Sequence, residues 1–118
     1  MSMILVVEDD AILGLDLKMT LEDAGYRVLG PAMSVSEALK LLNDQHVRGA
    51  ILDLNLGNER SDAIADRLQD DGIPYFFLTG HSAEVLHPRH RSKRVVSKPY
   101  HHSDLFRCLT EHFNDPEQ

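Results

Sequence analysis

The sequence lacks several features that define common classes of protein. A single cysteine, Cys108, excludes an internal disulfide, and its apolar helical surroundings indicate a small buried side chain. No apolar run approaches the roughly 18 residues that a membrane-spanning helix requires. Basic residues are outnumbered, at 12 Lys and Arg against 19 Asp and Glu. The formal net charge of -7 therefore argues against general binding of nucleic acid.

No charged-then-apolar leader precedes the first apolar run, so we expect a cytoplasmic protein without membrane or nucleic-acid partners. Its 118 residues suffice for one domain with a proper core and are too few for two. The hydrophobic share of 42% and the charged share of 26% are ordinary for a globular protein. We therefore expect residues 1–118 to form one domain.

Short apolar runs alternate with helical patterns along the chain. Residues 3–7 form a continuous apolar run, which is typical of a strand buried on both faces of a parallel sheet. The first helix is expected to turn Leu13, Leu17 and Leu21 inward. Strands are predicted at 3–7, 26–29, 50–52, 75–78 and 94–97. Helices are predicted at about 11–24, from Ser34 or Ser36 to about 44, at about 61–70, and from His102 or Ser103 through His112.

This alternation predicts an α/β fold. Five strands joined by helical links favour a flavodoxin-like parallel sheet of strand order 2-1-3-4-5 with helices on both faces. The second strand is expected to close at Gly30-Pro31. Pro88 would end or kink a regular helix, so we expect the fourth helix to be short or irregular.

Chemically competent side chains follow the strands. Glu8, Asp9 and Asp10 come directly after the first strand, and Asp53 comes directly after the third. Thr79 and Lys98 follow the fourth and fifth strands. Because ligands in such sheets bind outside the carboxyl ends of the strands, we expect these side chains to converge in one crevice.

The expected crevice suits phosphoryl transfer. Several carboxylates in one place repel each other, and a hard divalent ion such as Mg²⁺ removes the conflict. Asp53 can then attack as a nucleophile and form an aspartyl phosphate. The Lys98 ammonium can neutralise one phosphoryl oxygen while the Thr79 hydroxyl donates a hydrogen bond to another.

The order of these motifs resembles the receiver domain of bacterial two-component response regulators along the whole chain. The matching pieces are ILVVEDD at 4–10, ILDLNLG at 51–57, FLTG at 77–80 and VSKPY at 96–100. The resemblance implies that Asp53 is the phosphoacceptor, that Thr79 is the switch hydroxyl and that Lys98 binds the phosphate. It implies the Mg²⁺ ligands Glu8, Asp9, Asp53 and the backbone carbonyl of Asn55.

The family resemblance also implies partners and a mode of output. The phosphoryl donor would be a sensor histidine kinase or a histidine phosphotransfer protein, and a downstream protein partner would bind the face from the fourth strand to the last helix. No enzymatic activity is expected beyond the domain's own phosphorylation and dephosphorylation. The Lys98-Pro99 peptide bond is expected to be cis, as it is in receivers.

Two departures from the family pattern bear on the output. Val95 occupies the position where receivers commonly hold a Tyr or Phe, and LHPRHRSKR at 86–94 replaces a regular fourth helix. With FLTG, this is similar to atypical single-domain receivers that carry a Phe-Ala-Thr-Gly-type motif. We therefore expect phosphorylation to reorganise residues 81–94. The basic residues at 87–98 form either a solvated loop or a docking face for a partner.

Rival functions remain open at this point. A Mg²⁺-dependent phosphotransfer or nucleic-acid-processing domain of Toprim type would use Glu8 with Asp53-Leu54-Asn55, but it leaves Thr79 and Lys98 without a role. A haloacid-dehalogenase-type phosphatase usually places its nucleophile after the first strand. A pure interaction module would not need an intact acidic site.

Overall fold

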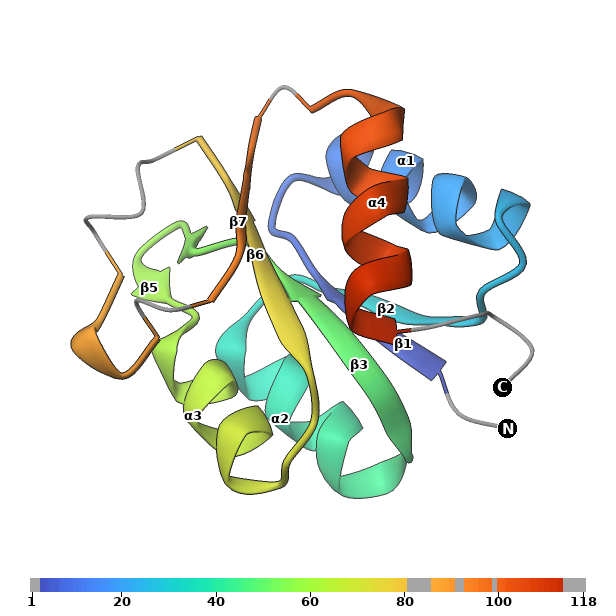
Figure 1. Ribbon diagram of the computed structural model, residues 1–118. Coiled ribbons are helices and arrows are strands. Elements are labelled where there is room, and N and C mark those ends of the chain that lie inside the picture. Colours follow the sequence, from blue (N-terminus) through green and yellow to red (C-terminus); the bar gives the residue numbers. More distant parts are fainter. Residues whose placement is uncertain (1–2, 81–85, 91–92, 99, 114–118) are drawn as a thin grey trace.

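The central element is a five-stranded parallel sheet (Figure 1). The computed structural model describes residues 3–80, 86–90, 93–98 and 100–113, and every side chain in these ranges except that of Thr79. The strands are β1 (Met3–Val7), β2 (Val28–Ala32), β3 (Val47–Leu52), β6 (Tyr75–Thr79) and β7 (Val95–Ser97). Their order, β2-β1-β3-β6-β7, is the predicted order 2-1-3-4-5, with labels shifted by a small intervening hairpin.

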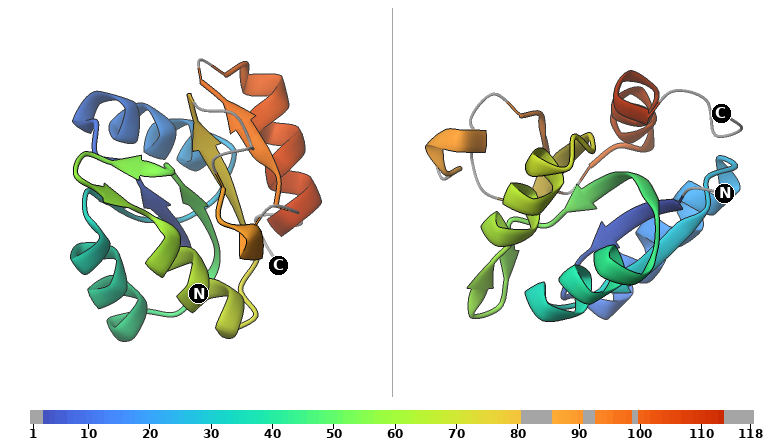
Figure 2. Two further views of the ribbon diagram at one scale, coloured as in Figure 1. Left: turned by 90° about the vertical axis from the view of Figure 1, so that its left-hand side faces the viewer. Right: turned by 90° about the horizontal axis from the view of Figure 1, so that it is seen from below.

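Helices cover both faces of this sheet, as predicted (Figures 1 and 2). The helices α1 (Ala11–Asp23) and α4 (His102–Phe113) lie on one face, and α2 (Val35–Asp44) and α3 (Asp62–Asp70) lie on the other. Strand β1 shows why both faces are apolar. Ile4 and Val6 join the core beneath α1 and α4, whereas Leu5 and Val7 join the core beneath α2 and α3.

The bounds predicted for the second strand were wrong. Strand β2 runs through Gly30-Pro31 to Ala32 instead of ending before them. Because β2 lies at the edge of the sheet, the missing N–H of Pro31 costs no bond to an outer neighbour. Gly30 has a φ of +102°, and a Cβ there would lie 2.8 Å from the carbonyl oxygen of Val6, so the position requires glycine.

The inward stripe predicted for α1 was correct in part. Leu17 and Leu21 are buried, but the side chain of Leu13 is 41% exposed. Residues four apart on an α-helix are rotated by about 40° from each other, so a stripe at that spacing turns away from the core. Gly14 occupies the inner position of the first turn instead, and a Cβ there would lie 3.0 Å from Pro31.

A small antiparallel hairpin, which was not predicted, follows the third strand of the sheet. It consists of β4 (Asn55–Leu56) and β5 (Glu59–Arg60). Gly57, with φ +69°, lies in its two-residue turn. The Gly-Asn pair at 57–58 is a recognised signal for such a turn. The hairpin matters because its turn lies beside the acidic residues at the carboxyl edge of the sheet.

The connection between β6 and β7 carries a single 3-10 turn, Pro88–His90, within its described residues. This agrees with the prediction of a short or irregular fourth helix. Residues 81–85 and 91–92 of that connection lie outside the described residues, as does Pro99 with the predicted cis peptide bond. Among the helices that are described, none has the length and apolar character needed to cross a membrane.

Candidate functional site

Three parallel strands deliver charged side chains to one edge of the sheet. Strand β1 ends before Glu8 and Asp9, β3 ends before Asp53, and β7 ends before Lys98. The backbone N–H of Asp53 donates a hydrogen bond of 2.9 Å to the carbonyl oxygen of Val7. This bond extends the pairing of β3 with β1 by one residue and places the acids beside each other. The predicted convergence of Glu8, Asp9, Asp53 and Lys98 is therefore present in the structure.

The ammonium of Lys98 bridges two of these carboxylates. Lys98 Nζ donates to Glu8 Oε1 at 2.5 Å and to Asp53 Oδ2 at 3.1 Å. Both acids are nearly inaccessible to solvent, since Glu8 is 2% and Asp53 is 7% exposed. Buried charges are stable only when they are paired, so the single cation holds two carboxylates that would otherwise repel each other.

Burial and neighbouring charges shift the pKa values of Glu8 and Lys98 in this site. Burial raises the pKa of Glu8, the hydrogen bond that it shares with Asp53 raises it further, and the bond from Lys98 opposes both. Burial lowers the pKa of Lys98, but its hydrogen bond to Glu8 and the charge of Asp53 outweigh this effect and raise it overall. Lys98 therefore stays cationic at neutral pH.

Asp9 completes an acidic cluster with Glu8 and Asp53. One carboxylate oxygen from each of these residues lies within 4.8 Å of the others. Asp9 is partly exposed and lies beside the hairpin, where a Cβ on Gly57 would come 3.8 Å from Asp9 Oδ2. Three converging carboxylates of hard oxygen character form a donor set that suits Mg²⁺.

Local hydrogen bonds hold the acids in place. Asp10, the third acid of the predicted group, is the N-cap of α1, and its Oδ1 accepts from the N–H groups of Ile12 and Leu13. The N–H of Asp10 in turn donates to Glu8 Oε2 at 3.2 Å. Asp10 therefore has a structural role at the start of the helix rather than a place in the acidic cluster.

The other two predicted site residues are less fully described. The N–H of Asn55 donates to Asp53 Oδ1 at 3.4 Å, so the residue lies next to the phosphoacceptor candidate. Its role as a carbonyl ligand remains a prediction. Thr79 ends β6 and pairs in register with Ser97 of β7, one residue before Lys98. The backbone of Thr79 thus lies at the correct edge, while its hydroxyl lies outside the described part of the chain.

A cavity of about 410 Å³ adjoins the charged site. Tyr100, which no sequence pattern had marked as a site residue, lines this cavity and donates a hydrogen bond of 3.3 Å from its hydroxyl to Asp16 Oδ2 in α1. Its position two residues after Lys98, in the motif VSKPY, was the available signal. The lining residues are Glu8, Leu13, Asp16, Leu78, Lys98, Tyr100 and His102.

The basic residues predicted to form either a solvated loop or a docking face are engaged within the molecule wherever they are described. Arg89 pairs with Asp66 and Asp70 of α3. Further on, Arg94 pairs with Glu111 of α4 at 3.0 Å. The ammonium of Lys93 lies 4.5 Å from the ring centre of Tyr75, and Lys98 belongs to the acidic site. Arg91 lies outside the described residues.

Comparison with known proteins identifies relatives of the same architecture. The chain is 28% identical over 112 residues to the phyllosphere-induced regulator PhyR of Methylorubrum extorquens, and the match covers 92% of this chain. It covers only 42% of that relative, so the chain spans less than half the length of the curated protein that it matches.

Solved structures are also similar to this chain over nearly its full length. SdrG from Sphingomonas melonis Fr1 is 32% identical and superimposes with a TM-score of 0.81, covering 93% of this chain and 94% of that one. A CheY-like receiver protein from Methanospirillum hungatei superimposes with a TM-score of 0.81 over 94% of this chain and 92% of that one. At 22% identity it supports the fold alone. The model of the response regulator receiver domain matches residues 4–110. This chain therefore belongs to the response regulator receiver domain family.

Proposed function

We propose that the chain accepts a phosphoryl group on Asp53 from the phosphohistidine of a sensor histidine kinase or a histidine phosphotransfer protein. The observation that carries this proposal is the position of the Lys98 ammonium, 3.1 Å from Asp53 Oδ2 at the carboxyl edge of the sheet. A carboxylate nucleophile beside a fixed cation suits phosphoryl transfer, because the cation can neutralise charge that develops on the phosphoryl oxygens. The rival Toprim-type domain gives Lys98 no such role, and family membership favours the receiver.

In the proposed step, a carboxylate oxygen of Asp53 forms a bond to phosphorus while the bond from phosphorus to the donor nitrogen breaks. The electron pair of the broken bond stays on the donor imidazole. Lys98 moves from the carboxylate to a phosphoryl oxygen, and the Thr79 hydroxyl donates to another. Attack of water on phosphorus later releases inorganic phosphate and restores the carboxylate. We propose no enzymatic activity beyond these two reactions.

The acidic cluster supports Mg²⁺ as the cofactor. Its three carboxylates converge within 4.8 Å, and burial together with a neighbouring acid raises the pKa of Glu8. A divalent cation relieves this repulsion more fully than Lys98 alone. Glu8, Asp9 and Asp53 would hold the ion, together with the backbone carbonyl of Asn55. Bound there, Mg²⁺ would neutralise charge on the phosphoryl oxygens.

We further propose that phosphorylation changes the binding of a downstream protein through the face formed by β6, β7 and α4. Val95 begins β7 and pairs in register with Phe77, so an inward swing of an aromatic ring at that position is not available as the readout. The β6–β7 connection leaves the site directly after Thr79. Its ion pairs with α3, and the pair of Arg94 with Glu111, are the contacts that a rearrangement would break.

The decisive experiment is phosphorylation with a small acyl phosphate in the presence of Mg²⁺, followed by measurement of the intact mass. The native chain should gain one phosphoryl group, and Asp53→Asn should gain none. Asp23→Asn is a matched control, because it makes the same chemical change at an exposed acid at the end of α1. Undiminished labelling of Asp53→Asn would refute the assignment, as would labelling that does not depend on Mg²⁺.

The output can be tested with beryllium trifluoride as the phosphoryl mimic, because the relative SdrG has been solved in a BeF3-activated conformation. That structure is 33% identical and has a TM-score of 0.77, covering 92% of each chain. A partner that depends on phosphorylation should bind the BeF3-treated chain and the untreated chain to different extents. Equal binding by both forms would refute the proposed output.

A further inference from the structure

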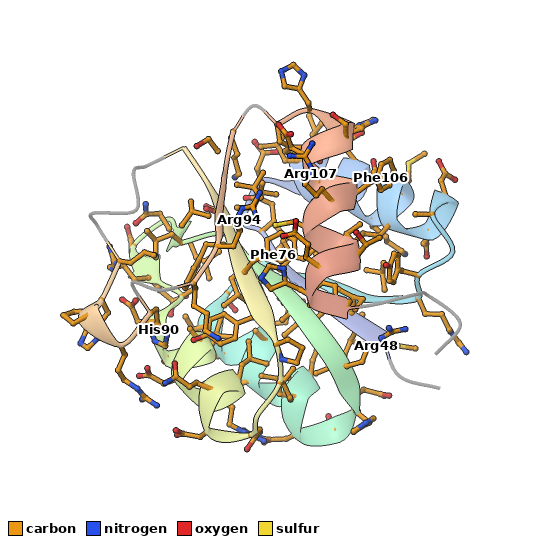
Figure 3. The ribbon with its side chains drawn as sticks, viewed as in Figure 1. Arg48, Phe76, His90, Arg94, Phe106 and Arg107 are labelled. Atoms are coloured by element: carbon orange, nitrogen blue, oxygen red, sulfur yellow. The ribbon has the colours of Figure 1, made fainter. Side chains whose placement is uncertain are left out.

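A buried histidine holds the β6–β7 connection against α3. His90 ends the Pro88–His90 turn and is 0% exposed, although it belongs to the least regular part of the sequence. Figure 3 shows the His90 side chain on the side of this turn that faces α3. Its ring makes edge contacts with Tyr75 and Phe77 of β6, at 5.7 Å and 6.2 Å between ring centres. Neither the acidic site nor the phosphoryl-transfer chemistry uses this residue.

Both ring nitrogens of His90 have polar partners. Nε2 lies 2.8 Å from Asp66 Oδ1, and Nδ1 lies 2.5 Å from the hydroxyl of Tyr75. The same hydroxyl donates to Gln69 Oε1 at 2.9 Å. Burial raises the pKa of Tyr75 to about 12, so the phenol keeps its single proton across the physiological range. All four side chains therefore form one continuous hydrogen-bonded chain.

Counting protons along this chain gives the charge that this set of hydrogen bonds requires of His90. The one proton of Tyr75 is directed to Gln69, so the phenol oxygen can only accept from His90 Nδ1. A carboxylate also only accepts, so Nε2 must donate to Asp66. Both ring nitrogens therefore carry protons, and His90 is an imidazolium in this arrangement.

Removal of the Nδ1 proton would reverse the chain of hydrogen bonds. Tyr75 would then have to donate to Nδ1, and the exposed amide of Gln69 would have to turn so that its NH₂ group faces the phenol oxygen. The neutral ring would keep its bond from Nε2 to Asp66, but that bond would no longer be assisted by the positive charge. The connection would thus be held less firmly when His90 is neutral.

The charges around His90 are closely balanced. Arg89 Nη1 shares the Oδ1 atom of Asp66 at 3.1 Å, and this cation opposes a second positive charge nearby. Asp70 pairs with Arg89 Nη2 at 2.9 Å and offsets that cation. Within the described part of the chain, the titratable and charged groups that face His90 are Asp66 and Asp70 of α3, Tyr75 of β6, and His87, Arg89 and Lys93 of the connection itself.

We propose that His90 is a proton-gated latch, whose imidazolium form fixes the Pro88–His90 turn to α3 through Asp66 and Tyr75, and whose deprotonation loosens that turn. The latch acts on the segment that leaves the end of β6, but it does not require phosphorylation of Asp53. It would make the contact between the Pro88–His90 turn and α3 sensitive to pH in the range where histidine changes its charge.

The direct test is nuclear magnetic resonance of the histidine rings in the full chain, from about pH 5 to about pH 8. At the acidic end both ring nitrogens of His90 should carry protons, and the Nδ1 proton should be lost as the pH rises. Amide exchange supplies the second readout, because the N–H of His90 donates to the carbonyl of His87 and the N–H of Lys93 donates to the carbonyl of His90. Protection factors at these two amides should fall about tenfold when the ring becomes neutral.

Gln69→Ala tests the proton count with little risk to folding, because Gln69 is exposed. Without the Gln69 oxygen, the phenol of Tyr75 is free to donate to Nδ1, so the neutral form of His90 gains and its titration should move to lower pH. Asp66→Asn should move the titration in the same direction. His46→Gln is the control, since it removes an exposed histidine between α2 and β3, outside the β6–β7 connection, and should leave the titration of His90 unchanged.

The outcomes are decisive in both directions. The latch is refuted if His90 carries only one ring proton over the whole range. It is also refuted if both amides keep their protection while the ring titrates. An unmoved titration in Gln69→Ala would refute the proton count. Because phosphorylation can be measured separately by mass in the same variants, failure of the latch would leave the proposed function of Asp53 untouched.

Discussion

The ammonium of Lys98 lies 2.5 Å from a carboxylate oxygen of Glu8, a residue 90 positions earlier in the sequence. The bond joins the first and last strands of the chain's sheet across the intervening β3 and β6. A single cation thus neutralises part of the acidic cluster and is positioned for a phosphoryl oxygen. Stability and proposed function therefore depend on the same side chain.

Replacing Lys98 by methionine should separate these two roles. Lys98→Met leaves the nearly buried acids Glu8 and Asp53 without their cation, so it should lower the free energy of unfolding by about 2 kcal/mol in the absence of metal. Mg²⁺ should restore more stability to the variant than it adds to the native chain, because Lys98 no longer repels the ion. Urea unfolding with and without Mg²⁺ measures both effects. An equal gain from Mg²⁺ in the two proteins would contradict the shared role.

The cap of α1 provides a second prediction. Asp10 Oδ1 accepts from the N–H of Ile12 at 3.0 Å and from that of Leu13 at 3.1 Å. Asp10→Ala should lower the free energy of unfolding by about 1 kcal/mol, and Asp10→Asn should retain most of it because asparagine is also a good N-cap. Urea denaturation of the three proteins measures the difference. A loss of similar size in both variants would instead assign the effect to the negative charge at the helix N-terminus.

The strand order and the convergence of the charged residues could be predicted from the sequence because they follow from local patterns. Apolar runs predicted where the strands lie. The connection rules for parallel sheets then predicted that Glu8, Asp53 and Lys98 lie at one edge. The end of β2 could not be predicted locally. Whether Pro31 stops a strand depends on whether its missing N–H faces a neighbour, and that is known only once β2 is placed at the sheet edge.

The His90 network was also beyond sequence analysis. His90, Asp66 and Tyr75 come from three different elements, and their spacing matches no local motif. The sequence showed only a basic segment interrupted by Pro88, which is equally compatible with a solvated loop. Partners that meet through tertiary packing alone leave no periodic signal along the chain.

A close approach of backbone and ring gives the third prediction. A Cβ on Gly49 of β3 would collide with the ring of Phe113, which is buried and stacks on Phe76 at 5.6 Å between ring centres. Gly49→Ala should therefore displace the end of α4 and lower the free energy of unfolding by about 2 kcal/mol. Gly80→Ala is the control, because a Cβ there meets no atom within 4 Å. Equal stability of the two variants would show that the ring moves aside without cost.

The tyrosines predict how stability responds to alkaline pH. Burial raises the pKa of Tyr75 to about 12, and burial together with Asp16 raises that of Tyr100 to about 12. Both phenols ionise near pH 10 in an unfolded chain. Between these two pH values the unfolded chain binds fewer protons than the folded chain. The stability that the two protonated phenols contribute should therefore be fully present below about pH 10 and should be lost as the pH rises toward about 12. Phenolate absorbance and urea unfolding across this range test it. Tyr100→Phe should reduce the dependence of the free energy of unfolding on pH in this range. An unchanged dependence would contradict the raised pKa of Tyr100.

The last prediction concerns how a phosphoryl group at Asp53 would reach the surface. Lys98 follows β7 directly, and β7 pairs with β6 through Phe77, Leu78 and Thr79, so a pull on Lys98 is transmitted to the ends of both strands. The backbone N–H of Phe77 also donates to the carbonyl of Arg94 at 3.0 Å, which ties the β6–β7 connection to the same strands.

Beryllium trifluoride with Mg²⁺ should therefore change amide exchange in residues 86–94 as well as in the loops after Asp9 and Asp53. The described part of the connection is held to α3 by the ion pairs of Arg89 and by the buried His90, and it is held to the core by the buried Leu86. A rearrangement that loosens these contacts would appear as lost amide protection. Asp53→Asn should abolish the change, because it removes the carboxylate oxygen to which the beryllium of the mimic bonds. His87→Gln should keep it, since that exposed side chain takes part in neither the acidic cluster nor the strand pairing. A response confined to the two acidic loops, with residues 86–94 unaltered, would mean that the signal leaves through another face.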